Sequence, residues 1–194
     1  ISSHDNVKLF KPQELTSLVW AYATLDVRHP ILFEKIADHI VSLDKLDRFK
    51  PQSISNISWA YATLGETNSH LYKKLADHIV ALESLNVFLP RGLSNIVRAN
   101  AIQMKNMYIF ADEWHPTLFK KVADHIIGLD SLESYNGQDC ANILWSYATA
   151  KEANSKLFQK VADHILSLDD LDEFSSQAIS NIVWAYATAG VSHP

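Results

Sequence analysis

The strongest constraint on the fold is an internal repeat of 39 residues. The word WAYAT or WSYAT recurs along the chain, and its tryptophans are Trp20, Trp59, Trp145 and Trp184. A second word, ADHI, recurs with matching steps, and its histidines are His39, His78, His125 and His164. Units of this length cannot bury a core alone, so the period indicates a stacked array of supersecondary units.

A series of aromatic residues marks the unit boundaries, at Phe10, Phe49, Phe88, Tyr135 and Phe174. The step is 39 residues except between Phe88 and Tyr135, where it is 47, so one unit carries eight extra residues. The predicted repeats are 10–48, 49–87, 88–134, 135–173 and a partial 174–194. We expect them to form one solenoid over residues 1–194, as a fragment of a longer array.

Each unit is predicted to contain two helices. The first helix begins at a Pro-Gln pair such as Pro51, because proline suits the first helical position, and it ends near Gly65. The second begins near Pro30 or Pro116, and its apolar residues recur at helical spacing. No segment alternates with period two, so no sheet is expected. The predicted fold is all-α, an α-solenoid of about four and a half antiparallel helix pairs with the first helices on the concave side.

Composition excludes several classes of protein. The single cysteine, Cys140, can form neither an internal disulfide nor a thiolate zinc site, which is typical of a reducing compartment. The longest charge-free stretches fall short of the roughly 20 residues of a membrane span, so no membrane insertion is expected. The net charge of −5 means that nucleic-acid binding would require a local basic surface.

The repeated histidines do not predict catalysis. Because His39 recurs once per unit along helices about 10 Å apart, the four side chains cannot converge on one metal ion. The sequence also lacks a glycine-rich phosphate loop, an HExxH motif and a paired-carboxylate cleft. We therefore expect no enzymatic activity, no catalytic residues, no cofactor, no metal and no small-molecule substrate.

One face of each first helix carries the candidate binding residues. At about 100° per residue, Ile57 and Tyr61 face the partner helix, and amides and an indole face the opposite way. In three units this polar set is Gln52, Asn56 and Trp59; Gln138, Asn142 and Trp145; and Gln177, Asn181 and Trp184. Such groups can bind an extended ligand, since amides bond to base edges or peptide groups and indoles stack. A second interpretation stays open, in which the indoles and asparagines pack between repeats.

The third unit differs most from the others. It keeps Asn95 but has Arg91 in place of glutamine and Arg98 in place of tryptophan, and Lys105 follows seven residues later. If the first helix continues, these three cations share the inner face. Either the third unit is a diverged repeat whose cationic side chains are solvated, or these side chains bind phosphate or carboxylate. The inserted segment 105–112 contains the apolar run 107–110 and either extends the helix or protrudes.

A wider pattern contains two similar words, PQSISNISWAYATLG from Pro51 to Gly65 and SQAISNIVWAYATAG from Ser176 to Gly190. With the LFxKxADHI word at fixed spacing, they resemble the octotricopeptide repeats and related helical repeats that precede RAP domains. The resemblance covers essentially the whole chain. It implies sequence-selective binding of single-stranded RNA in chloroplasts or mitochondria, acting on the stability, splicing or translation of organelle transcripts.

Two further functions compete with RNA binding. An armadillo-type scaffold grips an extended peptide with an inner ladder of asparagine and tryptophan, which Asn56 and Trp59 could provide. Alternatively, the repeats only pack within a large organelle complex. The placement of basic residues discriminates between RNA binding and peptide binding, because RNA needs cations along the groove and a peptide needs only the amides. The sequence favours a module that binds single-stranded RNA, with a protein or peptide partner as the alternative.

Overall fold

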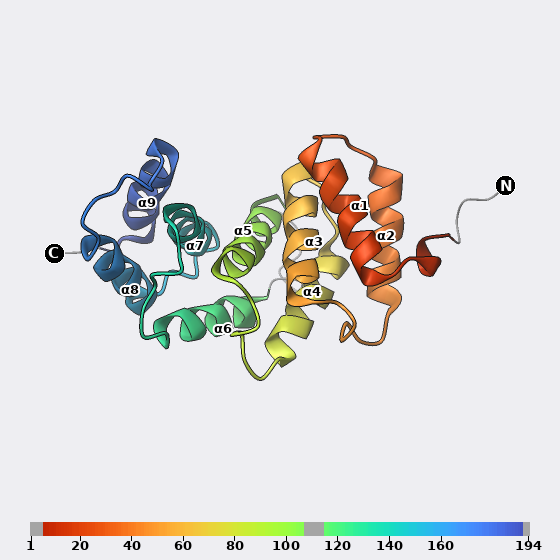
Figure 1. The fold of residues 1–194 in the computed structure, drawn as a ribbon, viewed down its shortest axis with the longest axis horizontal. Helices are drawn as coiled ribbons and strands as arrows, with labels where there is room; N and C mark the ends of the chain where they lie inside the picture. The colour runs from red at the N-terminus through yellow and green to blue at the C-terminus, as the bar shows by residue number, and fades with distance from the viewer. Residues whose placement is uncertain (1–5, 107–114, 192–194) are drawn as a thin grey trace.

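A computed structural model describes residues 6–106 and 115–191 of the chain. Within these residues the fold contains nine α-helices, a short 3-10 helix (η1, Asn6–Leu9) and no strand (Figure 1). The prediction of an all-α helical-repeat solenoid is confirmed. The apolar run 107–110 and Trp114 lie outside the described residues, so either expectation for the insertion stays a prediction.

The helices alternate as predicted between first and second members of a pair. The first helices are α1 (Pro12–Thr24), α3 (Pro51–Leu64), α5 (Pro90–Asn106), α7 (Gly137–Thr149) and α9 (Ser176–Ala189). The second helices are α2 (Pro30–Ser42), α4 (Ser69–Ala81), α6 (Pro116–Ile127) and α8 (Ser155–Leu166). The first helices therefore begin 39, 39, 47 and 39 residues apart, in step with the sequence repeat. Helix α5 is the longest, with 17 residues, and carries Arg91, Arg98 and Lys105.

Local chemistry explains where the first helices begin and end. Proline occupies the first position of α1 and α3, where its missing N–H costs nothing. Helix α7 begins with Gly137 instead, because a Cβ there would lie 2.7 Å from the ring of Phe174. Gly65 ends α3 and Gly190 ends α9 in the left-handed conformation, with φ of 68° and 64°. The same position after α7 is Lys151, with φ of 57°.

The stack has an inner row of first helices and an outer row of second helices (Figure 1). Successive first helices contact one another far more extensively than successive second helices do. Small side chains permit this close approach. The equivalent position of α3, α5, α7 and α9 carries a small buried residue, namely Ala60, Ala99, Ser146 and Ala185. Closer spacing of the first helices places them on the inside of the curve, as predicted.

The core lies between the two rows. Ile57 and Tyr61 are at most 1% exposed, which confirms the predicted packed face, and Ile79 on α4 is fully buried. The second helices contribute a phenylalanine in three of the units, and the rings of Phe33, Phe119 and Phe158 each pack edge to face on a tyrosine of the next first helix. The repeated apolar residues thus form one continuous core, shared between neighbouring units.

Lysines of the second helices hold neighbouring units together. In the repeated LFxKxADHI word, the lysine donates to backbone carbonyls at the end of the preceding second helix. The pairs are Lys74 with Asp44 (3.3 Å), Lys121 with Val80 (2.8 Å) and also with Leu82, and Lys160 with Leu129 (2.6 Å). Cations suit this position because the carbonyl end of a helix is electronegative. These lysines therefore connect neighbouring units through hydrogen bonds to backbone carbonyls.

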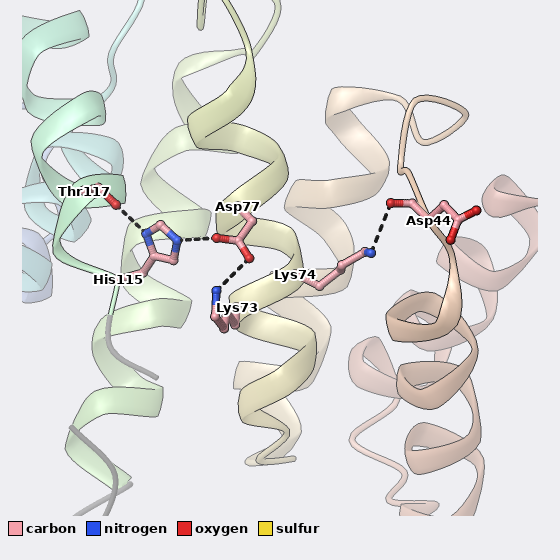
Figure 2. A network of polar contacts seen from close by, with 6 residues as sticks. All are labelled: Asp44, Lys73, Lys74, Asp77, His115 and Thr117. Carbon is pink, nitrogen blue, oxygen red and sulfur yellow. Dashed lines mark hydrogen bonds and ion pairs between the residues drawn. The ribbon is translucent and has the colours of Figure 1, made fainter. Parts of the chain in front are cut away.

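A second polar cluster joins α4 to the beginning of α6 (Figure 2). Asp77 accepts hydrogen bonds from Lys73 and pairs with the ring of His115, each at 2.8 Å, and Thr117 lies 2.7 Å from the other ring nitrogen. Partial burial raises the pKa of Asp77, but the hydrogen bonds from Lys73 and His115 outweigh that effect, and its pKa lies below the ordinary value. The charges of Lys73 and Asp77 on α4 are thus paired with each other.

Candidate functional site

A groove of about 590 Å³ opens on the inner row of helices, over α5, α7 and α9. We call it the arginine groove. It brings together nine of the predicted site residues, namely Trp59, Arg91, Asn95, Arg98, Gln138, Asn142, Trp145, Gln177 and Asn181. Residues from four first helices therefore meet at one surface, which is the convergence that a binding site requires.

The other four predicted residues lie elsewhere. Lys105 and Trp184 line a second pocket of about 570 Å³, which shares Trp145 with the arginine groove. We call this second pocket the lysine pocket. Gln52 and Asn56 lie on the first helix of the second unit and line neither the groove nor this pocket. The candidate surface is thus centred on the third to fifth units.

A stack of planar side chains crosses this surface. The guanidinium carbon of Arg98 lies 5.7 Å from the ring centroid of Trp145, within cation–π range. The ring of Trp145 in turn lies 6.3 Å from that of Trp184, tilted by 31°. Burial lowers the pKa of Arg98, but arginine remains charged in proteins at any physiological pH. Arginine therefore takes the place of tryptophan in the third unit without breaking the stack.

The indoles both pack between units and keep open surface. Trp59 and Trp145, in inner units of the stack, are partly buried against the core. Trp20 and Trp184 are 46% and 45% exposed, at the two ends of the inner row. The two interpretations of the tryptophans are therefore not exclusive, because one ring can contact a neighbouring unit and still offer a face to a ligand.

The amides of the groove are ordered by pairing along their own helices. Gln138 donates to Oδ1 of Asn142 at 2.9 Å, and Gln177 donates to Oδ1 of Asn181 at 3.0 Å. Asn142 is the more buried of the two asparagines, at 8% exposure. Each pair uses the asparagine oxygen as an acceptor, so a bond from the asparagine to a ligand would be donated by its N–H groups. Such pre-ordering lowers the entropy cost of binding.

The groove also contains two residues that sequence reasoning missed, Asn136 and Asp139. They form a reciprocal cap at the beginning of α7, where the backbone N–H of Asp139 donates to the Asn136 side chain at 2.9 Å. The Asp139 carboxylate also accepts from the Ser94 hydroxyl at 2.8 Å. Burial raises the pKa of Asp139, and hydrogen bonds from Ser94 and Asn136 oppose that effect. An asparagine followed three residues later by aspartate could have indicated this cap.

The cations of the two hollows differ from those of the second helices. Within residues 6–106 and 115–191, no ion pair involves Arg91, Arg98, Lys105 or Lys151. By contrast, Lys120 on α6 pairs with Asp124 at 2.6 Å. The residues that line the two hollows thus include these four cations and one carboxylate, that of Asp139, which interacts electrostatically with Arg91, so positive charge predominates there although the chain as a whole is acidic.

The cysteine and the repeated histidines do not line this surface. Burial raises the pKa of the Cys140 thiol to about 12, so a nucleophilic thiolate does not form at neutral pH. The repeated histidines His39, His78 and His125 are half-buried, and burial lowers their pKa. Among the described residues, no group of three or more histidine, cysteine, aspartate or glutamate side chains could hold a metal ion.

Comparison with known proteins assigns no family to the chain. No protein-family model matches it, and no curated protein matches it. Of the helices in the described ranges, none combines the length and the apolar character needed to cross a membrane. The functional argument therefore rests on the inner surface and its chemistry.

Proposed function

We propose that the chain is a non-enzymatic module that binds single-stranded RNA in the arginine groove. The observation that carries this proposal is the stack of Arg98, Trp145 and Trp184, with unpaired cations and ordered amides on either side. Proteins that bind single strands combine aromatic platforms for bases with a positively charged path for the backbone. Both elements occur here on one surface.

Each chemical group of the groove has a counterpart in RNA. The indole of Trp145 in the groove and the exposed indole of Trp184 in the adjoining lysine pocket can stack on bases, and Arg91 offers paired N–H donors to a phosphate. The amide groups of Asn142 and Asn181 can bond to base edges or sugar hydroxyls, which is how single-stranded RNA is read. The resemblance of the first-helix words to octotricopeptide repeats supports the same ligand and, with it, transcripts of chloroplasts or mitochondria.

An extended peptide is the competing ligand. The pairs Gln138–Asn142 and Gln177–Asn181 would suit it, because amides bond equally well to peptide groups. The unpaired cations favour RNA, since a neutral peptide needs none of them. An assay must therefore separate a contribution from phosphate charge from one that comes from amides alone.

The test is equilibrium binding of labelled homopolymeric RNAs at two salt concentrations. Each phosphate contact on a single strand contributes about 0.7 to the slope of log affinity against log salt. Arg98→Ala should weaken all four homopolymers similarly and flatten the slope by roughly that amount. The matched control is Lys120→Ala, which removes one cation from an exposed site on α6.

The outcomes separate the two ligands. An unchanged salt slope in Arg98→Ala, or equal slopes in Arg98→Ala and Lys120→Ala, would remove the arginine groove from the interface. Absence of RNA binding by the wild-type chain, together with binding of an extended peptide that Asn142→Ala weakens, would establish the peptide ligand instead.

A further inference from the structure

The lysine pocket and the arginine groove lie at opposite ends of the same helices. The arginine groove contains Arg91, Gln138 and Gln177, from the first turns of α5, α7 and α9. The lysine pocket contains Lys105 and Thr188, from the last turns of α5 and α9. Trp145 borders both hollows, so together they form one path parallel to the first helices.

Cations follow this path along α5. Arg91, Arg98 and Lys105 are spaced by seven residues, which places them on one helical face about 10 Å apart. The first two are at the arginine groove and the third is at the lysine pocket. The positive charge therefore extends for roughly 21 Å along one helix rather than from unit to unit across the stack.

A fourth cation completes the lysine pocket at the end of α7. Lys151 lies at the position where the second and fifth units have Gly65 and Gly190, and like them it adopts a left-handed φ. Beside it, Thr149 lines the pocket, and its buried hydroxyl has no hydrogen-bond partner among the described residues. The pocket is thus lined by two cations, by the indoles of Trp145 and Trp184, and by Thr149 with its buried, unpaired hydroxyl.

We infer that the lysine pocket is a second phosphate subsite for the strand bound in the arginine groove. The strand then runs along α5 and α7, over Trp145, and does not cross the stack with one base for each unit. This inference rests on the proposed function. It implies an occluded site of about four to six nucleotides, at the low end of the range for single-strand-binding folds. It also implies that the first unit takes no part.

The lysine test uses fluorescence anisotropy of labelled oligouridylates, 4, 6, 8 and 12 nucleotides long, at several salt concentrations. The double variant Lys105→Gln/Lys151→Gln should lower the salt slope by about 1.4, the contribution of two phosphate contacts. The control Lys120→Gln/Lys156→Gln makes the same charge change at exposed positions on α6 and α8 and should leave the slope unchanged. Affinity should stop rising beyond about six nucleotides.

A pair of tryptophan variants tests the direction of the strand. Trp184 and Trp20 are equally exposed, at 45% and 46%, but only Trp184 borders the path. Trp184→Ala should weaken binding about tenfold, as expected for loss of one stacked base, and Trp20→Ala should have no effect. Circular dichroism establishes that each variant retains the wild-type helix content.

Each result has a defined meaning. Equal losses in Trp184→Ala and Trp20→Ala would show that the strand crosses the units, which overturns this inference and leaves RNA binding intact. An unchanged slope in the double lysine variant overturns it in the same way. If the wild-type chain binds no oligouridylate or other RNA at low salt, both the subsite and the proposed function are wrong.

Discussion

The hydroxyl of Tyr61, in α3, donates a 2.7 Å hydrogen bond to the backbone carbonyl of Phe33, in α2. The relationship recurs in two later units, where the pairs are Tyr147 with Phe119 at 2.7 Å and Tyr186 with Phe158 at 2.8 Å. Each bond joins the first helix of one unit to the second helix of the preceding unit. The tyrosine of the repeated WAYAT or WSYAT word is therefore a connection between units.

Removing one of these hydroxyls should destabilise the stack. Tyr147→Phe leaves the ring in place but leaves the Phe119 carbonyl without this buried donor, so the free energy of unfolding should fall by about 1–3 kcal/mol. Chemical denaturation measures the change. Tyr22→Phe is the matched control, because Tyr22 occupies the same position of the first unit and its hydroxyl has no hydrogen bond among the described residues. A comparable loss in both variants would contradict this role.

A core substitution should be more costly. Ile57 is fully buried between the rows, so Ile57→Ala should lower the free energy of unfolding by about 2–5 kcal/mol through lost contacts and a residual cavity. Because neighbouring units are coupled, hydrogen exchange should also accelerate in α1 and α5. Ile31→Ala, at a site that is 61% exposed, should change stability by less than about 0.5 kcal/mol. Unchanged thermal unfolding of Ile57→Ala would contradict the packing.

The helices were predictable from sequence because each unit repeats the residues that begin, fill and end a helix. The boundaries follow from proline or an asparagine cap at helix starts and from glycine at some ends, all of which act locally. The inner polar face was also predictable, since helical periodicity alone separates Asn142 from Ile143. Nine predicted residues consequently line one groove.

Other features of the site depend on neighbouring units and could not be derived from one helix. The contact between Arg98 and Trp145 arises only when α5 and α7 are stacked, and so does the burial of Asp139 against Ser94. The interface between the second and third units lacks the repeated bond from a tyrosine to a phenylalanine carbonyl. Asn100 stands where other units have tyrosine, and its side chain donates to the Ile96 carbonyl of its own helix. Tyr72 stands in place of phenylalanine and donates to the backbone carbonyl of Ser58, within its own unit, at 3.2 Å.

The left-handed backbone of Lys151 does not follow from its own side chain, because only the alignment of units places this lysine where Gly65 and Gly190 stand. A residue other than glycine in the left-handed region is strained by roughly 1–2 kcal/mol. Glycine relieves that strain but increases the entropy of the unfolded chain, so Lys151→Gly should stabilise the fold by about 0.5–1 kcal/mol. Thermal unfolding measures this gain. Destabilisation would indicate that the lysine side chain makes a compensating contact in the fold.

Acidification should weaken the fold before carboxylates titrate. Burial lowers the pKa of His39, His78 and His125 below the ordinary value of 6.5, and the charge of Lys8 adds to the effect on His39. The unfolded chain therefore takes up protons first, and stability declines as the pH falls through 6.5 toward the lower folded-state pKa values. Urea midpoints at pH 7.5, 6.5 and 5.5 test this. The double variant His78→Gln/His125→Gln should show a smaller decline than the wild-type chain.

The amide of Asn142 should contribute to sequence preference and not to the salt response. Asn142→Ala removes neutral N–H donors, so affinity should fall by about 1 kcal/mol for each hydrogen bond lost to a base or sugar, and the ranking of homopolymeric RNAs should change. The salt slope should stay as in the wild-type chain, because no phosphate contact is removed.

Asn56→Ala is the matched control for Asn142→Ala, since Asn56 occupies the equivalent position on α3 but lines neither hollow. Its RNA affinity and its ranking of homopolymers should equal those of the wild-type chain. An equal change of preference in the two variants would place the bases on successive units and contradict a strand that runs along α5 and α7. Loss of affinity in Asn142→Ala with a flattened salt slope would instead mean that Asn142 orients Arg98 or another phosphate contact.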